Sequence, residues 1–251
     1  MQSTPPNPDP LYIFGCKSHS GRPWDPSQWM TVDDRVRGGS SVSHLDISDP
    51  RARALFHGNL DIKTLGGAGF ASQKTVPELF GSTGLDLSDY DTLVVDIDES
   101  ASDAKTYTLI LKDTEALAKR PDGREQSTVS WEHDFRLGGS SGGRLVMRFR
   151  DFAPTYRGRP KPDAEPLNLK SILAMSIMMR SHFGEQEGDF SLTMRSIAAQ
   201  RHEDGNENSG EATPSRQSQQ EEAIVEKGQP TTAASKGGWL SWLGSVLGGR
   251  G

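Results

Sequence analysis

The sequence contains little cysteine, a modest share of apolar residues and no long hydrophobic run. The single cysteine, Cys16, excludes an intramolecular disulfide and a zinc site built from several cysteines. Because no run of about 18 apolar residues occurs, the sequence predicts no transmembrane helix. Hydrophobic residues make up only 33% of the 251 residues, so part of the chain is not expected to pack into a core.

Basic charge is also scarce. The chain carries 28 Lys and Arg residues against 34 Asp and Glu residues, a formal net charge of −6. A nucleic-acid-binding protein needs a basic surface that neutralises phosphates, so we predict no nucleic-acid partner.

The N-terminal stretch lacks the features of a targeting signal. It has no basic start followed by an apolar segment, which excludes a secretory signal. Pro5, Pro6, Pro8 and Pro10 oppose the amphipathic helix of a mitochondrial presequence. On these grounds alone the sequence predicts a cytoplasmic protein that is not secreted.

The composition changes near residue 200. Residues 201–236 are polar and contain almost no bulky apolar side chains, so burial cannot repay the entropy of ordering them. We therefore expect a flexible N-terminus at 1–10, a folded domain at 11–200, a disordered linker at 201–236 and a short segment rich in Trp and Leu at 237–251.

Apolar residues recur with a period of two within the expected domain, the pattern of half-buried strands. The alternating residues are Ala54, Phe56, Leu60 and Ile62; Leu93, Val95 and Ile97; Tyr107, Leu109 and Leu111; Val129, Trp131, His133 and Phe135; Leu145, Met147 and Phe149; and Phe190, Leu192 and Met194. Residues 172–179 are apolar on both faces, which favours a strand buried on both sides. Short strands with Gly- and Pro-rich joints predict an all-β sandwich.

Residues 139–143 match the G-x-S-x-G pattern of hydrolase nucleophile elbows by their letters. Such an elbow needs a helix after the serine. Residues 144–149 instead alternate like a strand, so we interpret the glycine-rich stretch as a flexible connection and Ser141 as no nucleophile.

Other patterns typical of chemistry are also incomplete. Residues 66–69 resemble a phosphate loop, but Ser72 stands where a third glycine is required and no helix pattern follows. The six histidines lack the spacing of a metal site. Asp96 and Asp98 fall on the polar face of a strand, where we expect them to be solvated. The sequence therefore predicts no catalytic residue, no cofactor and no metal.

A charged, glycine-rich loop begins at Asp34. An Asp beside an Arg, here Arg35, can form a buried ion pair that fixes a loop, and Gly38 with Gly39 permits a sharp turn. We expect this segment to act as a loop latch.

The C-terminal segment carries an apolar stripe with helical spacing. It is too short to span a bilayer or to be a stable helix alone in water, so it is expected to fold against a membrane surface, a partner groove or its own domain. The expected contact residues are Trp239, Leu240, Trp242, Leu243, Val246 and Leu247.

Six segments, in order, resemble the signatures of the complex I intermediate-associated protein 30 family. They are DDRVRGGSS at 33–41, FHGNL at 56–60, GGAGFAS at 66–72, LSDYD at 87–91, DFAPTYRGR at 151–159 and GDFSL at 188–192. The motif residues to which the resemblance gives a role are Asp34, Arg35, Gly38, Gly39, Ser40, Gly67, Phe70, Ser72, Arg157 and Gly158.

This resemblance implies a galactose-binding-like β-sandwich of the jelly-roll type. It also implies a non-enzymatic, chaperone-like factor that binds protein clients, namely assembly intermediates of mitochondrial NADH dehydrogenase, and hence a mitochondrial location. The alternative is a cytosolic module that binds a carbohydrate or another small ligand through aromatic residues at the sandwich rims, such as Trp24, Trp29 and Tyr156.

Overall fold

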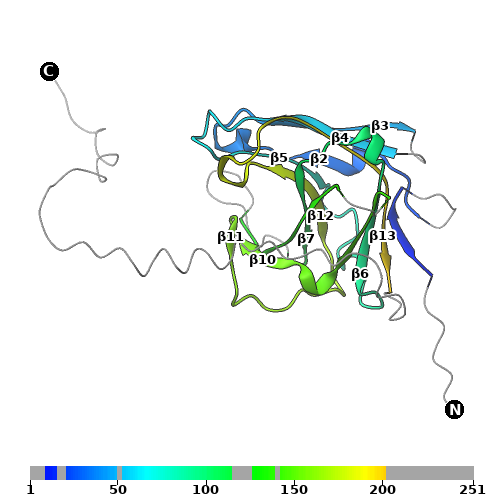
Figure 1. Ribbon diagram of the computed structural model, residues 1–251. Coiled ribbons are helices and arrows are strands. Elements are labelled where there is room, and N and C mark those ends of the chain that lie inside the picture. The colour runs from blue at the N-terminus through cyan, green and yellow to red at the C-terminus, as the bar shows by residue number, and fades with distance from the viewer. Residues whose placement is uncertain (1–8, 16–20, 50–52, 115–125, 139–141, 202–251) are drawn as a thin grey trace, which may run out of the picture. The chain divides into compact units, whose positions relative to one another are not determined.

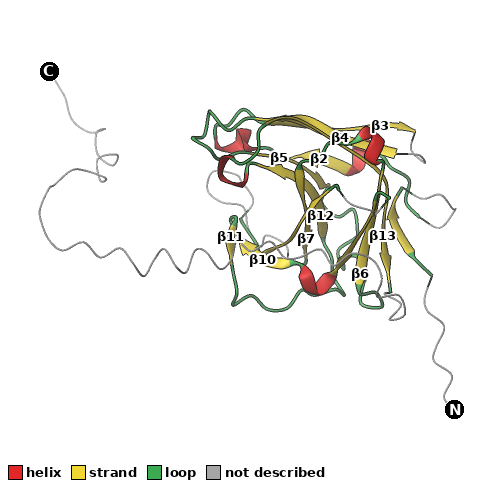
Figure 2. Ribbon diagram, in the orientation of Figure 1, coloured by secondary structure: helices red, strands yellow, loops and turns green. Residues whose placement is uncertain are grey.

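Two antiparallel β-sheets face each other across a shared core in a computed structural model of the chain (Figures 1 and 2). The structure describes residues 9–15, 21–49, 53–114, 126–138 and 142–201. Within these residues the predicted all-β sandwich is confirmed. The expected linker and C-terminal segment lie outside the described residues.

The first sheet is organised around β13 (Gly188–Gln200), which pairs with β4 along its first half and with β6 along its second half. The strand order is β3-β4-β13-β6-β9, and β1 also pairs with β13. The bounds are β1 Leu11–Phe14, β3 Val42–Asp49, β4 Arg53–Leu60, β6 Thr92–Ile97 and β9 Arg144–Arg148.

The second sheet has the order β11-β10-β8-β7-β12-β5-β2. Its bounds are β2 Trp29–Thr31, β5 Phe70–Thr75, β7 Thr106–Lys112, β8 Ser130–Arg136, β10 Ala153–Tyr156, β11 Arg159–Pro160 and β12 Ala174–Arg180. β12 confirms the strand predicted within 172–179, because Met175 and Met179 on its inner face and Ser176 on its outer face are all buried.

Helical structure among the described residues is limited to short 3-10 turns. These are η1 Pro26–Gln28, η2 Asp34–Arg37, η3 Glu99–Ala101, η4 Phe149–Asp151 and η5 His182–Gly184. No helix in the described part of the chain is long and apolar enough to cross a membrane.

The expected rim aromatics lie mostly in the core, and for two of them the prediction is wrong. Trp24 and Trp29 are buried, and their rings lie 5.3 and 4.9 Å from the ring of Phe14. The indole N–H of Trp24 is satisfied internally, since it donates to the backbone carbonyl of Arg195 at 3.1 Å. Burying these large rings removes more apolar surface from water than a rim position would. Only Tyr156 remains exposed, at 39%.

Three smaller strand predictions also differ from the structure. Ile62 lies beyond the end of β4, and Phe149 begins η4 instead of continuing β9. Asp98 was expected to be solvated but is buried, because it follows β6 and accepts hydrogen bonds from Ser100 and from the guanidinium of Arg53. A period of two shows which residues share one face of a strand, but it does not show which other residues of the fold cover that face.

Residues 139–143 connect two strands, as predicted, although residues 139–141 are outside the described part of the chain. The flanking strands β8 and β9 belong to different sheets. β9 follows directly, so the strand predicted after the glycine-rich stretch is confirmed.

Candidate functional site

Most of the family-motif residues meet at one edge of the sandwich, which we call the motif edge: residues 33–43, 61–72 and 181–186. The hydroxyls of Ser40 and Thr64 lie 3.1 Å apart, and the amide of Ser181 donates to the carbonyl of Gly69 at 3.0 Å. These contacts join η2, the loop before β5 and η5. Segments separated by more than 100 residues therefore form one surface.

Asp34 is the fixed point of this edge. Its side chain is fully buried and accepts three hydrogen bonds, from the amide of Ser41 at 3.0 Å, the hydroxyl of Ser41 at 2.6 Å and the amide of Phe70 at 3.2 Å. Backbone and hydroxyl donors therefore satisfy the charge of Asp34, a stable arrangement for a buried carboxylate.

Asp33 makes a second, parallel set of bonds. It is also buried and accepts from the hydroxyl of Ser43 at 2.6 Å, the amide of Ser43 at 3.1 Å and the amide of Ser72 at 3.0 Å. Arg35 pairs with Asp33 at 3.1 Å while its own side chain stays 55% exposed. The expected buried pair between Asp34 and Arg35 is therefore wrong. Instead, the carboxylates of Asp33 and Asp34 fix this loop by accepting hydrogen bonds from serine hydroxyls and backbone amides.

The two glycines after η2 allow the loop to close on Asp34. Gly38 has a φ of +84° and ends η2 in the left-handed region that favours glycine. Gly39 has no such φ, but a Cβ at this position would overlap the carboxylate of Asp34. Glycine is therefore required at position 39 because a side chain would collide with Asp34, and at position 38 because of the left-handed backbone conformation.

We expect Gly39→Ala to lower the free energy of unfolding by about 1–3 kcal/mol, because the added methyl group must displace a buried, hydrogen-bonded carboxylate. Urea unfolding followed by circular dichroism measures the change. Ser40→Ala at the next, exposed position is the control, with an expected change within about 0.5 kcal/mol. Equal stabilities for the two variants would contradict this role of Gly39.

Arg157 and Gly158 lie elsewhere. They form the tip of the β10–β11 hairpin, and β11 ends the second sheet on the side opposite to β5 and β2. The structure therefore brings eight of the ten motif residues to one edge and these two to the other. The six C-terminal contact residues fall outside the described part of the chain.

Phe183 is the most exposed large apolar residue described, with 97% of its surface accessible. It lies in η5, where both His182 and Phe183 have positive φ, at +44° and +59°. Two consecutive non-glycine residues in this region are strained, and a bulky aromatic there is an outlier. Both the exposure of the Phe183 ring and the strain of the turn are unfavourable in free energy, and packing within the domain does not compensate for them.

Hydrogen bonds hold the strained turn in place. The side-chain amide of Gln186 donates to the carbonyls of Thr106 at 2.8 Å and Arg180 at 2.6 Å, and its oxygen accepts from the amide of Thr106. Burial lowers the pKa of His182, so this imidazole is neutral at physiological pH. The loop thus presents the ring of Phe183 from a rigid support.

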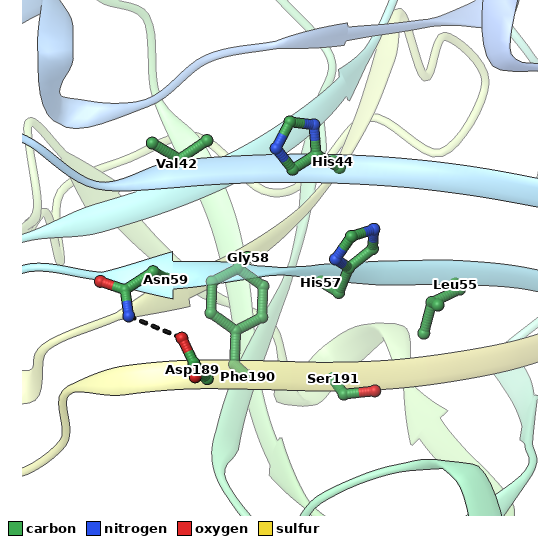
Figure 3. Close-up of a pocket in the computed structure, with 9 residues that line it drawn as sticks. All are labelled: Val42, His44, Leu55, His57, Gly58, Asn59, Asp189, Phe190 and Ser191. Atoms are coloured by element: carbon green, nitrogen blue, oxygen red, sulfur yellow. Dashed lines mark hydrogen bonds between the residues drawn. The ribbon is translucent and has the colours of Figure 1, made fainter.

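A shallow groove of about 540 Å³ lies on the outer face of β3, β4 and β13 (Figure 3). His44 and His57 face each other across the two strands with ring centroids 5.4 Å apart. Asn59 donates to Asp189 at 2.7 Å along the groove. The groove therefore places two imidazoles beside polar side chains.

The groove does not assemble a nucleophile and a base. His57 contacts Asp46 at 2.9 Å, and such a pair supplies two of the three members of a catalytic triad. The hydroxyl of Ser191 points away from His57 and donates to the carbonyl of Ala101 (Figure 3). Among the residues that the structure describes, no three His, Cys, Asp or Glu side chains form a group that could hold a metal ion.

The sequence placed Asp33 and Ser41 in the first family segment without giving them a role, and it did not single out Ser43 or Phe183. Two adjacent aspartates followed by serines at alternate positions were a usable signal, because buried carboxylates need hydroxyl and amide donors. Nothing in the residues around Phe183 indicates that its ring is exposed.

A family model described as Complex I intermediate-associated protein 30 matches residues 17–194. The match includes the whole motif edge. An uncharacterized protein of Schizosaccharomyces pombe is 43% identical over 193 residues, which cover 75% of this chain and 83% of that protein.

Proposed function

Because the chain belongs to the complex I intermediate-associated protein 30 family, we propose that it is a non-enzymatic assembly factor that binds protein clients, the partly assembled intermediates of respiratory complex I. Family membership points to a role related to complex I assembly. The chaperone-like action on a client is our inference, and the motif edge is the surface that we assign to it.

The observation that carries this assignment is Phe183. An aromatic ring that is 97% exposed contributes free energy only when another molecule covers it. Rigid aromatic side chains at the centre of a contact surface dominate many protein interfaces. Val36 in η2, on the same edge, is also 48% exposed and adds apolar area.

The test is co-migration with complex I subunits on native gels. Cell extracts containing the untagged chain are separated and blotted for the chain and for subunits of NADH dehydrogenase. We expect wild type in a large band that contains such subunits, and Phe183→Ser to reduce that fraction about tenfold through loss of an interface anchor. Val146→Ser, at a half-exposed residue on the opposite edge, is the matched control and is expected to behave as wild type.

A wild-type chain that always runs as a free monomer would overturn the proposed function. Co-migration that survives Phe183→Ser would leave assembly intact and remove the motif edge as the client surface. Both variants alter exposed side chains, so equal thermal unfolding temperatures verify that a lost band reflects binding.

The remaining sequence predictions complete the proposal. We assign residues 201–236 to a linker and residues 237–251 to contact with a membrane surface or a partner. Deleting residues 237–251 tests the second assignment, because only a contact role predicts weaker membrane or client association from a chain with an unchanged domain.

A further inference from the structure

The stretch from residue 148 to residue 161 reverses the charge of the chain around it. The whole chain carries a formal charge of −6. This stretch contains one acidic residue, Asp151, and five basic residues, Arg148, Arg150, Arg157, Arg159 and Lys161.

We call this stretch the arginine edge. It follows the side of the sandwich opposite to the motif edge. It leaves β9, the last strand of the first sheet, passes through η4 and forms β10 and β11 at the end of the second sheet (Figure 1). All four of its arginines are exposed. The charges therefore face solvent along an edge that joins both sheets.

Lys161 pairs with Asp163 at 3.0 Å, but the charges of the four arginines are hardly neutralised by carboxylates. The side chains of Arg148 and Arg159 form no hydrogen bond or ion pair with the residues described, and Arg150 reaches Asp151 only at 3.9 Å. The guanidinium of Arg157 lies 5.3 Å from the ring centroid of Tyr156, which is itself 39% exposed. The Nε of Arg157 also donates to the hydroxyl of Ser127 at 3.3 Å, a neutral partner. The hairpin tip thus combines guanidinium groups that no carboxylate of the described residues neutralises with an amphipathic aromatic ring.

We propose that the arginine edge binds the surface of a bilayer that contains anionic phospholipids. Guanidinium groups bind phosphate oxygens with two parallel hydrogen bonds, and tyrosine is enriched at membrane interfaces. A row of arginines along an exposed edge fits an extended anionic surface, because each arginine can contact a different anionic group there. A small anionic ligand would instead need the arginines to surround one point. This binding is separate from client binding at the motif edge.

The test is sedimentation of the full chain with vesicles of phosphatidylcholine alone or mixed two to one with phosphatidylglycerol. We expect binding only to the anionic vesicles, weakened by salt. Arg157→Gln combined with Arg159→Gln is expected to lower binding about 30-fold, from the usual effect of two basic residues near an anionic surface. Arg35→Gln with Arg37→Gln removes the same charge from the motif edge and is expected to leave binding within about twofold of wild type.

Three results would overturn the proposal. The first is no sedimentation with anionic vesicles, and retention on a polyglutamate resin in that case would indicate an acidic protein partner. The second is an equal loss from both double variants, which would indicate non-specific attraction. The third is unchanged binding of the Arg157 and Arg159 variant together with its loss in Trp239→Ser with Trp242→Ser, which would place lipid contact in the C-terminal segment.

Discussion

Asp34→Ala is expected to lower the free energy of unfolding by about 4 kcal/mol or more. The substitution removes a fully buried carboxylate that accepts three hydrogen bonds, and hydrogen bonds to a charged group contribute about 1.5–3 kcal/mol each. It also leaves the buried amide of Ser41 and the partly buried amide of Phe70 without this acceptor. Because domains of this size are stable by about 5–15 kcal/mol, this loss is a large fraction of the total stability. Circular dichroism should show a fall of about 10 °C or more in the unfolding temperature.

Two further variants separate the causes. Asp163→Ala removes an exposed carboxylate that pairs with Lys161 at 3.0 Å, and is expected to leave the stability close to that of the wild type. Asp34→Asn keeps the shape but aims an amide donor at N–H groups, so it should still destabilise, by less than alanine. If Asp34→Ala were as stable as Asp163→Ala, the motif edge would not depend on the buried carboxylate.

The local parts of the fold could be predicted from the sequence because strand periodicity is local. Alternation of apolar residues identified the strands β6, β7 and β8, and a run apolar on both faces identified β12. Pairing could not be predicted in the same way. The two sheets place β8 and β9 apart although they are consecutive in the chain, and no local pattern states which strand crosses between layers.

In the candidate site, too, local motifs could be predicted from the sequence and contacts between distant segments could not. Family motifs led to Asp34, Gly39 and Phe70, which the fold does bring together. The bond between Asp33 and the amide of Ser72 joins residues 39 positions apart, and only the pairing of whole strands determines such a contact. Phe183 was missed for a related reason, since its exposure depends on a turn fixed by Gln186, whose side chain bonds to the distant backbone of Thr106.

Arg180→Ala is expected to lower the free energy of unfolding by about 3 kcal/mol. The guanidinium of Arg180 bonds Glu132 at 2.6 Å and both oxygens of Asp134 at 2.6 Å, so it connects β12 to β8 across β7. Burial disfavours the charged guanidinium, but the carboxylates of Asp134 and Glu132 outweigh it and raise the pKa of Arg180. Alanine leaves these two carboxylates close together without their shared cation. The loss lies at the low end for a buried pair because Asp134 keeps 39% of its side chain exposed to water.

A rescue by the partners distinguishes the lost ion pairs from lost packing. Arg180→Ala with Glu132→Gln and Asp134→Asn removes all three charges and leaves the same missing side-chain volume as Arg180→Ala alone, so urea unfolding should recover a large part of the stability that Arg180→Ala loses. Arg159→Ala, an exposed arginine on β11, is the control and should change stability by at most about 0.5 kcal/mol. If the triple variant were no more stable than Arg180→Ala, the cost would come from the missing side-chain volume of Arg180. The carboxylates would then be tolerated unpaired, because the hydroxyls of Thr108 and Thr155 already donate to Asp134 and Glu132 at 2.6 Å.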